Sequence, residues 1–325
     1  MAVGFKSGLA PQMEQFVEYK QTTRKWNSSS IFHLGCFDKY CAEKFPNAKE
    51  LCIEMFEWCL EKPTEHGNTC SYRISPIREF VNFSRKMKWT TLEPPQPPAY
   101  KPRNYVPHFF TEDEKVRFFI ECDKFAVNYR SWQSDERKIL CPMVIPAIYR
   151  LLYSTGMRTN EVRLLKCEDI DFMTGVININ DSKGNDRHRV AMHRSLWDLL
   201  IRYHEAMSRH LHNRIYFFPD EGDKPYSPAW MTTTFQRIWK NVNSSQKANP
   251  YNLRHNYAIE NINRWKNVGY EINDKLIYLG RTMGHVKFSS TLYYFHLAPC
   301  FASKLKDLCD DKFNHLLPDF DHGKE

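Results

Sequence analysis

Four short segments between residues 155 and 296 carry side chains that can bind a phosphate group or react with it. They are an arginine after a turn in "TGMRTNE", a lysine in "SKGND", a tyrosine and an arginine three residues apart in "YNLRH", and a histidine followed by two tyrosines in "MGHVKFSSTLYYFH". Arginine offers a rigid fork of donors to phosphate oxygens, lysine and histidine can transfer a proton, and a phenol can act as a nucleophile. Each segment alone also has an ordinary explanation, such as a solvated lysine at an exposed turn.

The order and spacing of the four segments resemble those of the tyrosine recombinases, also called the phage-integrase family. The family pattern is an Arg in T-G-x-R-x-x-E, a Lys on a β-hairpin, an H-x-x-R followed by His, an L-G-H or L-G-W, and a Tyr nine residues further on. The matching residues are Arg158, Glu161, Lys183, Tyr251, Arg254, His255 and His285. Because 294 − 285 = 9, the resemblance selects Tyr294 as the nucleophile and not its neighbour Tyr293.

The resemblance implies that Tyr294 attacks the phosphorus of a DNA phosphodiester, which gives a 3′-phosphotyrosine and releases a 5′-hydroxyl. Arg158 and Arg254 would hold the non-bridging oxygens, where charge gathers in the transition state. Lys183 would protonate the departing 5′-oxygen, because a lysine among cationic neighbours has a lowered pKa. The phosphotyrosine conserves the energy of the broken bond, so the reaction requires no ATP, metal or other cofactor.

The other matching residues have supporting roles in this interpretation. His285 and Tyr251 would hydrogen-bond the scissile phosphate. Glu161 would orient either Arg158 or the region of His255 from behind the site.

Two features depart from the family pattern. The family usually has histidine at position 251, and a phenol with a reference pKa of about 10 can donate a hydrogen bond but cannot act as an imidazolium. The segment 262–282 before "MGH" is also somewhat long. Two alternatives stay open: a DNA-binding protein that has lost catalysis, and a type IB topoisomerase-like enzyme that nicks and closes DNA.

The elements that must position these residues are mostly helical. Apolar periodicity predicts helical segments at 10–26, 28–45, 47–62 and 69–89, and again from 111 onward, interrupted by a β-hairpin near 176–193. We therefore predict a mainly α fold with a small β-hairpin or sheet. The predicted parts are a helical core-binding domain at 1–91, a proline-rich linker at 92–107, a catalytic domain at 108–298 and a C-terminal tail helix at 299–325 that docks onto a neighbouring subunit.

The segment 69–89 has one apolar face and one basic face. Its basic residues include Arg73, Arg78, Arg85 and Lys86. A helix of this kind can lie along DNA phosphates, although an ordinary solvated face gives the same pattern. The whole chain has 46 basic and 38 acidic residues and a net charge of +8, a modest excess compatible with nucleic acid, an anionic membrane or an acidic partner.

No run of apolar residues approaches the roughly 18 that a membrane span needs, and the N-terminus lacks a signal sequence. None of the ten cysteines forms a C-x-x-C, and no Cys/His set has zinc spacing, which predicts free thiols and no metal site. We expect a cytoplasmic protein associated with the bacterial nucleoid. The resemblance implies a double-stranded DNA recombination site as partner, a homotetramer on two sites and a monomer or dimer in isolation. The short two-domain form, without an arm-binding domain, favours a mobile genetic element.

Overall fold

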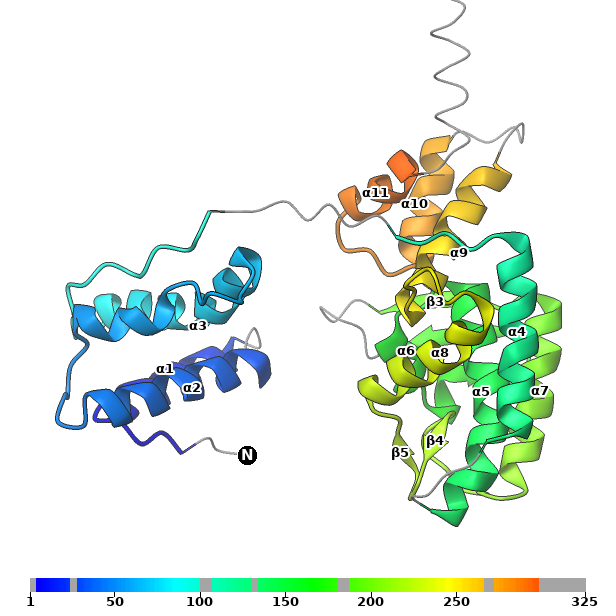
Figure 1. The fold of residues 1–325 in the computed structure, drawn as a ribbon, viewed down its shortest axis with the longest axis horizontal. Helices are drawn as coiled ribbons and strands as arrows, with labels where there is room; N and C mark the ends of the chain where they lie inside the picture. Colours follow the sequence, from blue (N-terminus) through cyan, green and yellow to red (C-terminus); the bar gives the residue numbers. More distant parts are fainter. Residues whose placement is uncertain are drawn as a thin grey trace, which may run out of the picture. The chain divides into compact units, whose positions relative to one another are not determined.

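The computed structural model describes residues 4–23, 28–99, 107–129, 134–180, 187–265 and 272–297 (Figure 1). The chain forms two compact units, Met1–Tyr105 and Val106–Glu325. The predicted fold class, mainly α with a small sheet, is confirmed. Within the described ranges, no helix has the length and apolar character needed to cross a membrane.

The first unit is helical in its described part, with α1 (Ala10–Thr22), α2 (Ser28–Lys44), the 3-10 helix η1 (Ile53–Cys59) and α3 (Gly67–Lys86). Its core is rich in aromatic rings: the ring of Phe16 lies 5.5 Å from that of Phe80 and 5.4 Å from that of Phe83. The prediction of a long amphipathic segment at 47–62 is wrong in extent, because only Ile53–Cys59 is helical and its winding is 3-10. Pro63 follows closely and disfavours helical conformation in the residue before it.

The second unit holds the other described helices. They are α4 (Glu112–Val127), α5 (Asp135–Thr155), α6 (Thr159–Arg163), α7 (Arg194–Ser208), α8 (Pro228–Val242), α9 (Pro250–Arg264), α10 (Ile272–Thr282) and α11 (Ser289–Leu297). The predicted capping box of α4 is confirmed, since Thr111 Oγ1 accepts from the Glu114 amide and the Glu114 carboxylate accepts from the Thr111 amide. Such a box satisfies two helix-end donors at once.

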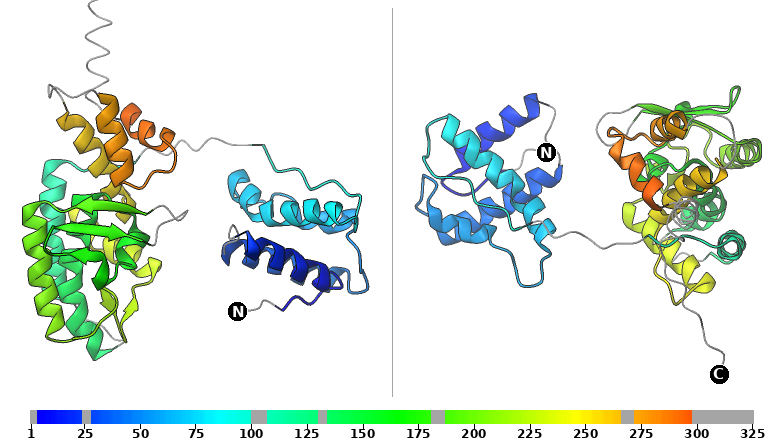
Figure 2. Two further views of the ribbon diagram at one scale, coloured as in Figure 1. Left: turned by 180° about the vertical axis from the view of Figure 1, so that it is seen from behind. Right: turned by 90° about the horizontal axis from the view of Figure 1, so that it is seen from above.

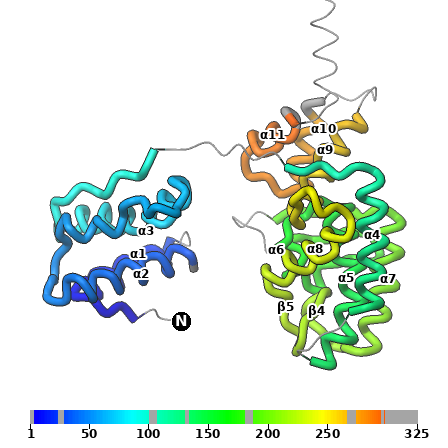
Figure 3. The backbone as a smooth tube through the Cα atoms, in the orientation of Figure 1, coloured from blue at the N-terminus to red at the C-terminus, as the bar shows by residue number. Residues whose placement is uncertain are grey.

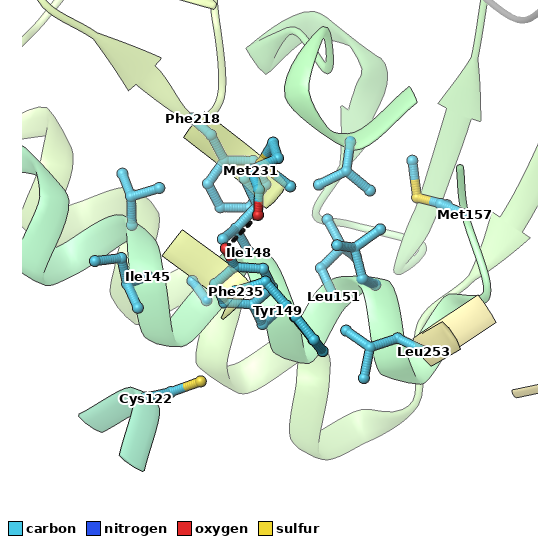
Figure 4. Packing of buried hydrophobic residues seen from close by; sticks show 14 of the residues in the cluster. Cys122, Ile145, Ile148, Tyr149, Leu151, Met157, Phe218, Met231, Phe235 and Leu253 are labelled. Carbon is cyan, nitrogen blue, oxygen red and sulfur yellow. Dashed lines mark hydrogen bonds between the residues drawn. The ribbon is translucent and has the colours of Figure 1, made fainter. Parts of the chain in front are cut away.

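The core of the second unit surrounds α5, which packs against α4, α7 and α9. Figure 4 shows this core, where the Tyr149 hydroxyl donates to the Met231 carbonyl at 2.9 Å. That bond satisfies the polar end of a ring that has no exposed surface. The packing of α9 on α5 fixes the helix that carries Arg254.

A small antiparallel sheet lies on one face of these helices (Figure 2, left). The predicted hairpin corresponds to β2 (Val176–Ile179) and β3 (His188–Ala191), and β1 (Ile170–Asp171) adds a third strand beside β2 after the short 3-10 helix η2 (Cys167–Asp169). The sequence reading missed β1 and the pair β4 (Pro219–Asp220) and β5 (Lys224–Pro225). Strands of two residues are too short to show an alternating pattern.

The boundary between the two units falls at 105/106, inside the proline-rich segment 92–107. The predicted tail helix at 299–325 lies outside the described residues. Figure 3 follows the backbone through α9, α10 and α11, and α11 packs against both of the others. Arg254 lies on α9, Tyr294 lies on α11, and His285 follows the end of α10.

Candidate active site

The centre of the candidate site is the turn that ends α10. Gly284 adopts a left-handed conformation with φ of 62°, and its amide donates to the Arg281 carbonyl at 3.1 Å. The His285 amide donates to the Gly280 carbonyl at 2.9 Å. This pair of bonds is a Schellman motif, which turns the chain away from the helix and fixes His285 directly after it. The carbonyls of Met283 and Gly284 then face two arginines.

Arg158 and Arg254 converge on this turn. Arg254 Nη2 donates to the Met283 carbonyl at 2.7 Å, and Arg158 Nη2 donates to the Gly284 carbonyl. Arg254 Nη1 also donates to the Gly156 carbonyl at 2.6 Å, in the turn that leads to Arg158. Two guanidinium groups from separate parts of the chain therefore bond to the carbonyls of consecutive residues.

Arg158 is the N-cap residue of α6, and Glu161 on that helix bonds to it. The Glu161 carboxylate accepts from the Arg158 amide at 2.7 Å and from Arg158 Nη1 at 2.5 Å. Glu161 is 3% exposed, whereas the Arg158 side chain is 20% exposed. Of the two roles expected for Glu161, the geometry matches the orientation of Arg158.

Arg254 is 1% exposed, which is unusual for a charged side chain. Its terminal nitrogens have acceptors, but its Nε–H is buried and bonds to no acceptor among the described residues. An unsatisfied buried donor costs about 1–3 kcal/mol. The side chain thus has a donor left over for an additional acceptor.

His285 lies between Arg254 and α11. Its Nε2 is 3.0 Å from Arg254 Nη2, and its Nδ1 is 2.8 Å from Thr291 Oγ1. Burial, and then the charges of Arg254 and Arg158, lower the pKa of His285 to about 4. The imidazole is therefore neutral near pH 7.

The two tyrosines of α11 have different surroundings. Tyr294 is 3% exposed, and its ring lies parallel to that of His285 at 5.9 Å, whereas Tyr293 is 41% exposed. Burial and the neighbouring Tyr251 raise the pKa of Tyr294 to about 12, and the charge of Arg254 opposes this rise. Tyr294 is therefore the tyrosine that lies close to Arg254 and His285, and its phenol is protonated near pH 7 in the absence of substrate. Its assignment as the nucleophile stays a prediction.

Tyr251 and His255 lie one turn apart on α9, with rings 4.9 Å apart in an edge-to-face contact. Tyr251 is 41% exposed, and His255 is buried with its ring 5.4 Å from that of Tyr294. Burial, followed by the charge of Arg254, lowers the pKa of His255 to about 4. Both residues thus border Tyr294.

Lys183 lies outside the described residues. The strands on either side of it, β2 and β3, border a cleft of about 990 Å³. Residues lining this cleft include Arg187, Arg189, Arg281, Gly284 and His285. The two strands on either side of Lys183 therefore border the same cleft as the Met283–Gly284 turn, whose carbonyls accept from the two arginines.

The basic residues of α3 divide into two groups. Arg73 is 6% exposed, and its guanidinium bonds to Glu65 and to the carbonyls of Trp58 and Leu60. It stabilises the interior of the first unit and does not belong to the exposed basic face. Arg78 is half-buried, while Arg85 and Lys86 are exposed at the end of the helix.

Three residues near the turn were missed by sequence reasoning: His188, Gly280 and Thr291. The His188 ring packs where a Cβ on Gly284 would stand, 2.6 Å from its Cε1, and Nε2 is 3.9 Å from Glu161 Oε2. Nothing in the sequence marks these residues, because each acts through contacts with distant elements. Among the described residues, no group of three or more His, Cys, Asp or Glu could hold a metal ion.

Comparison with known proteins decides the family. The sequence pattern of the phage integrase family matches residues 134–299, which is more than half of the chain and includes every motif residue described above. The chain belongs to the phage integrase family. The family recognised from the motifs is thus confirmed, and with it the class of enzyme, a tyrosine recombinase that cleaves and rejoins DNA.

Relatives of this phage integrase chain cover most of its length. A tyrosine recombinase of Thermosipho africanus is 25% identical over 88% of this chain and 95% of its own. Tyrosine recombinase XerC of Staphylococcus carnosus is 26% identical over 71% of each chain.

Two solved structures share the fold of this chain. XerH bound to a palindromic difH substrate superposes with a TM-score of 0.60 at 16% identity, over 87% of this chain and 78% of that one. The Tn1549 transposon integrase in complex with transposon right-end DNA gives a TM-score of 0.56 at 14% identity, over 87% and 94%. The predicted two-domain recombinase fold agrees with both.

Proposed function

We propose that this chain is a site-specific DNA recombinase of a mobile genetic element that uses Tyr294 as its nucleophile. The observation that carries the proposal is the convergence of Arg158 and Arg254 on one turn, with Tyr294 buried beside Arg254. Two fixed cations next to a phenol match the needs of phosphodiester cleavage, in which negative charge grows on the non-bridging oxygens.

The scissile phosphate would bind against the two guanidinium groups. It would supply an acceptor for the buried Nε–H of Arg254, which bonds to no acceptor in the described part of the chain. The Arg158 side chain, which is 20% exposed, would donate to the same phosphate as a second guanidinium group. Preorganised charge of this kind needs no rearrangement at the moment of reaction, and losing one such donor typically costs about 2.7–4 kcal/mol.

In the cleavage step, the phenolic oxygen of Tyr294 forms a bond to phosphorus while the bond from phosphorus to the 5′-oxygen breaks. The phenol gives its proton to solvent water, and the leaving oxygen takes one from Lys183, the general acid of this proposal. The nearby charge of Arg254 favours the phenolate, because it opposes the rise in the Tyr294 pKa. Ligation is the reverse: a 5′-hydroxyl from a second strand attacks the phosphotyrosine and releases Tyr294.

His285 and Tyr251 would donate hydrogen bonds to oxygens of the same phosphate. Neutral His285 is already anchored on Arg254, and Tyr251 presents an exposed phenol one turn before Arg254 on α9. Glu161 and His255 would act from behind the site: Glu161 holds Arg158, and His255 packs between Tyr251 and Tyr294.

The partner in this proposal is a double-stranded DNA recombination site. In the first unit, Arg78, Arg85 and Lys86 would contact backbone phosphates, whereas Arg73 is buried against Glu65 and is left out of this group. Contacts of this kind make affinity salt-dependent. Four protomers would act on two sites, each reaching a neighbour through the tail at 299–325, and the enzyme would work at the nucleoid in the cytoplasm.

The assignment to a mobile element has support from one structural neighbour, the Tn1549 transposon integrase, solved with transposon right-end DNA. Relatives named XerC leave the type of recombination site open to experiment. Mapping the cleaved site on native DNA identifies whether it lies at the end of an element.

A nicked suicide substrate that loses a short fragment after cleavage tests the chemistry. We expect a covalent protein–DNA adduct that disappears with Tyr294→Phe and persists with Tyr293→Phe. An adduct that disappears only with Tyr293→Phe would move the nucleophile by one residue. If wild-type protein binds the site but forms no adduct, the chain is a DNA-binding protein without catalysis.

A further inference from the structure

The cleft of about 990 Å³ that is bordered by the sheet and α10 extends beyond the residues that the cleavage step uses. Gly284 and His285 line it at the active-site turn. The sheet contributes Asn178 of β2 and Arg189 of β3, which are cross-strand partners, and Arg187 directly before β3. The cleft therefore continues from the catalytic turn along the sheet.

Helix α10 contributes a second set of side chains to this cleft. Tyr278 and Arg281 are three residues apart, which places them on one face of the helix, and both line the cleft. Tyr278 is 64% exposed, and Val286 in the same lining is 70% exposed. Single exposed apolar side chains are ordinary on a protein surface, but two of them at one cleft beside cationic groups indicate a binding surface.

The cleft also carries an excess of positive charge. Arg187, Arg189 and Arg281 are all exposed, and within the described ranges none of them pairs with a carboxylate. Among the described lining residues, the acidic one is Glu168, whose carboxylate lies 3.5 Å from the Lys166 ammonium group. The lining therefore suits a ligand with several negative charges.

Arginines around an exposed aromatic ring have the chemistry of a site for unpaired nucleotides. The arginines bind phosphates, and every base has a flat face that can stack on an aromatic side chain. Apolar side chains beside such a ring can also separate stacked bases in a duplex. A groove that binds only the backbone of a duplex needs the cations alone, so the exposed ring of Tyr278 favours a base that has left its partner.

We propose that this cleft binds an unpaired nucleotide of the cleaved strand, next to the scissile phosphate, with its base stacked on Tyr278 and its phosphate on Arg281. The proposal rests on the proposed function, because the strand is positioned by its scissile phosphate at the active-site arginines. Strands that change partners in recombination must first lose their base pairs next to the break. A site that holds an unpaired base lowers the cost of that step.

Single-turnover cleavage of two suicide substrates tests the proposal. One is fully paired, and the other has a mismatch at the base pair next to the scissile phosphate. On the paired substrate we expect Tyr278→Ala to be slower than wild type by about 5- to 100-fold, which corresponds to the loss of one stacked base. On the mismatched substrate the base is free of its partner before binding, so the loss should be below about 3-fold.

Tyr278→Phe is the matched variant, because it keeps the ring and removes only the hydroxyl. We expect it to cleave both substrates within about 2-fold of the wild-type rate. A Tyr278→Phe protein as slow as Tyr278→Ala would overturn the stacking role, and so would equal losses of Tyr278→Ala on the two substrates. Because Tyr278 is 64% exposed, both variants should fold, and thermal unfolding checks that they do.

Photocrosslinking locates the base without cleavage. Tyr294→Phe protein is bound to a site that carries 5-iodouracil next to the scissile phosphate, and the attached residue is identified by mass spectrometry after irradiation. We expect attachment to Tyr278, and attachment only to residues outside the cleft would overturn the proposal. If Tyr278 is attached but wild-type protein forms no covalent adduct with either suicide substrate, the proposed function fails and the nucleotide site stands.

Arg281→Gln tests the phosphate contact. We expect the slope of log K against log salt concentration for binding of the DNA site to decrease in size by about 1, the effect of one lost phosphate contact. Arg202→Gln is the control, because Arg202 is exposed on α7, bonds to the Asp198 carbonyl of its own helix and does not line the cleft. A salt slope that Arg281→Gln leaves at the value of this control would contradict the contact.

Discussion

Arg158 and Arg254 donate hydrogen bonds to the carbonyls of two consecutive residues, Gly284 and Met283. The two side chains come from different elements, α6 and α9, so their common position is a product of tertiary structure. The turn therefore acts as a template that sets the distance between the two cations. Its geometry depends on the left-handed Gly284, since few other residues adopt that conformation without strain.

Replacing Gly284 should damage both stability and cleavage. In Gly284→Ala the methyl group would meet the His188 ring at 2.6 Å and Arg158 Nη1 at 3.1 Å, in addition to the strain of a positive φ. We expect a loss of about 1–3 kcal/mol in the free energy of unfolding and a fall in adduct formation. Gly222→Ala is the control, because Gly222 also has a positive φ, of 66°, but nothing lies within 4 Å of its new methyl group. Equal effects of the two substitutions on cleavage would contradict the template role.

The geometry of Arg254, beyond its charge, should be necessary for cleavage. Lysine keeps the charge in Arg254→Lys but cannot reach the Gly156 and Met283 carbonyls together, as the guanidinium does. We expect the single-turnover cleavage rate to fall by about 100-fold or more, the cost of one preorganised donor. Arg264→Lys on the same helix is the control, because its side chain is 73% exposed and outside the site. A cleavage rate for Arg254→Lys within a few-fold of wild type would contradict the bidentate role.

The two buried histidines should make the folded protein sensitive to mild acid. Unfolded histidine takes up a proton near pH 6.5, whereas the pKa values of His255 and His285 are lowered to about 4 in the folded chain. Between these values the unfolded state binds more protons, so the free energy of unfolding should decrease as the pH falls from about 6.5 to about 4. Urea denaturation across this range measures the slope.

His255→Gln should reduce that slope, because one of the two groups no longer takes up a proton on unfolding. The exposed His212 offers the matched substitution, and His212→Gln should leave the slope as in wild type. A free energy of unfolding that stays constant between pH 6.5 and pH 4 in the wild-type protein would show that neither buried histidine is held neutral.

The fold class could be predicted from the sequence, and so could local features whose signal lies in neighbouring residues. The capping box at Thr111 depends on neighbouring residues, and so does the turn at Gly156 that precedes Arg158. In contrast, periodicity placed Arg73 on a basic face without revealing that Glu65 draws its guanidinium inside. An ion pair with a residue outside the helix does not change the apolar periodicity of the helix, so the sequence pattern does not reveal it.

The contacts that organise the site were also beyond sequence reasoning. The carbonyls that receive the arginines belong to the backbone and carry no side-chain signature. In the sequence, nothing distinguishes Thr291 from other helix residues, and Gly280 is simply a residue that lowers helix stability. Their meaning depends on the packing of α10 against α11, which only the structure provides.

Tyr251 stands where the family usually has histidine, and its substitution tests what the phenol contributes. Tyr251 is 41% exposed, so Tyr251→Phe should fold normally but lose the hydrogen bond to the phosphate, which slows cleavage by about 10-fold. Removing the phenol also lowers the pKa of Tyr294, since Tyr251 contributes to its rise, but a protonated nucleophile near pH 7 gains little from that change. Tyr251→His should restore a donor and keep cleavage near the wild-type rate. The control is Tyr19→Phe, on a tyrosine of α1 that is 49% exposed, and a Tyr251→Phe protein as active as that control would remove Tyr251 from the site.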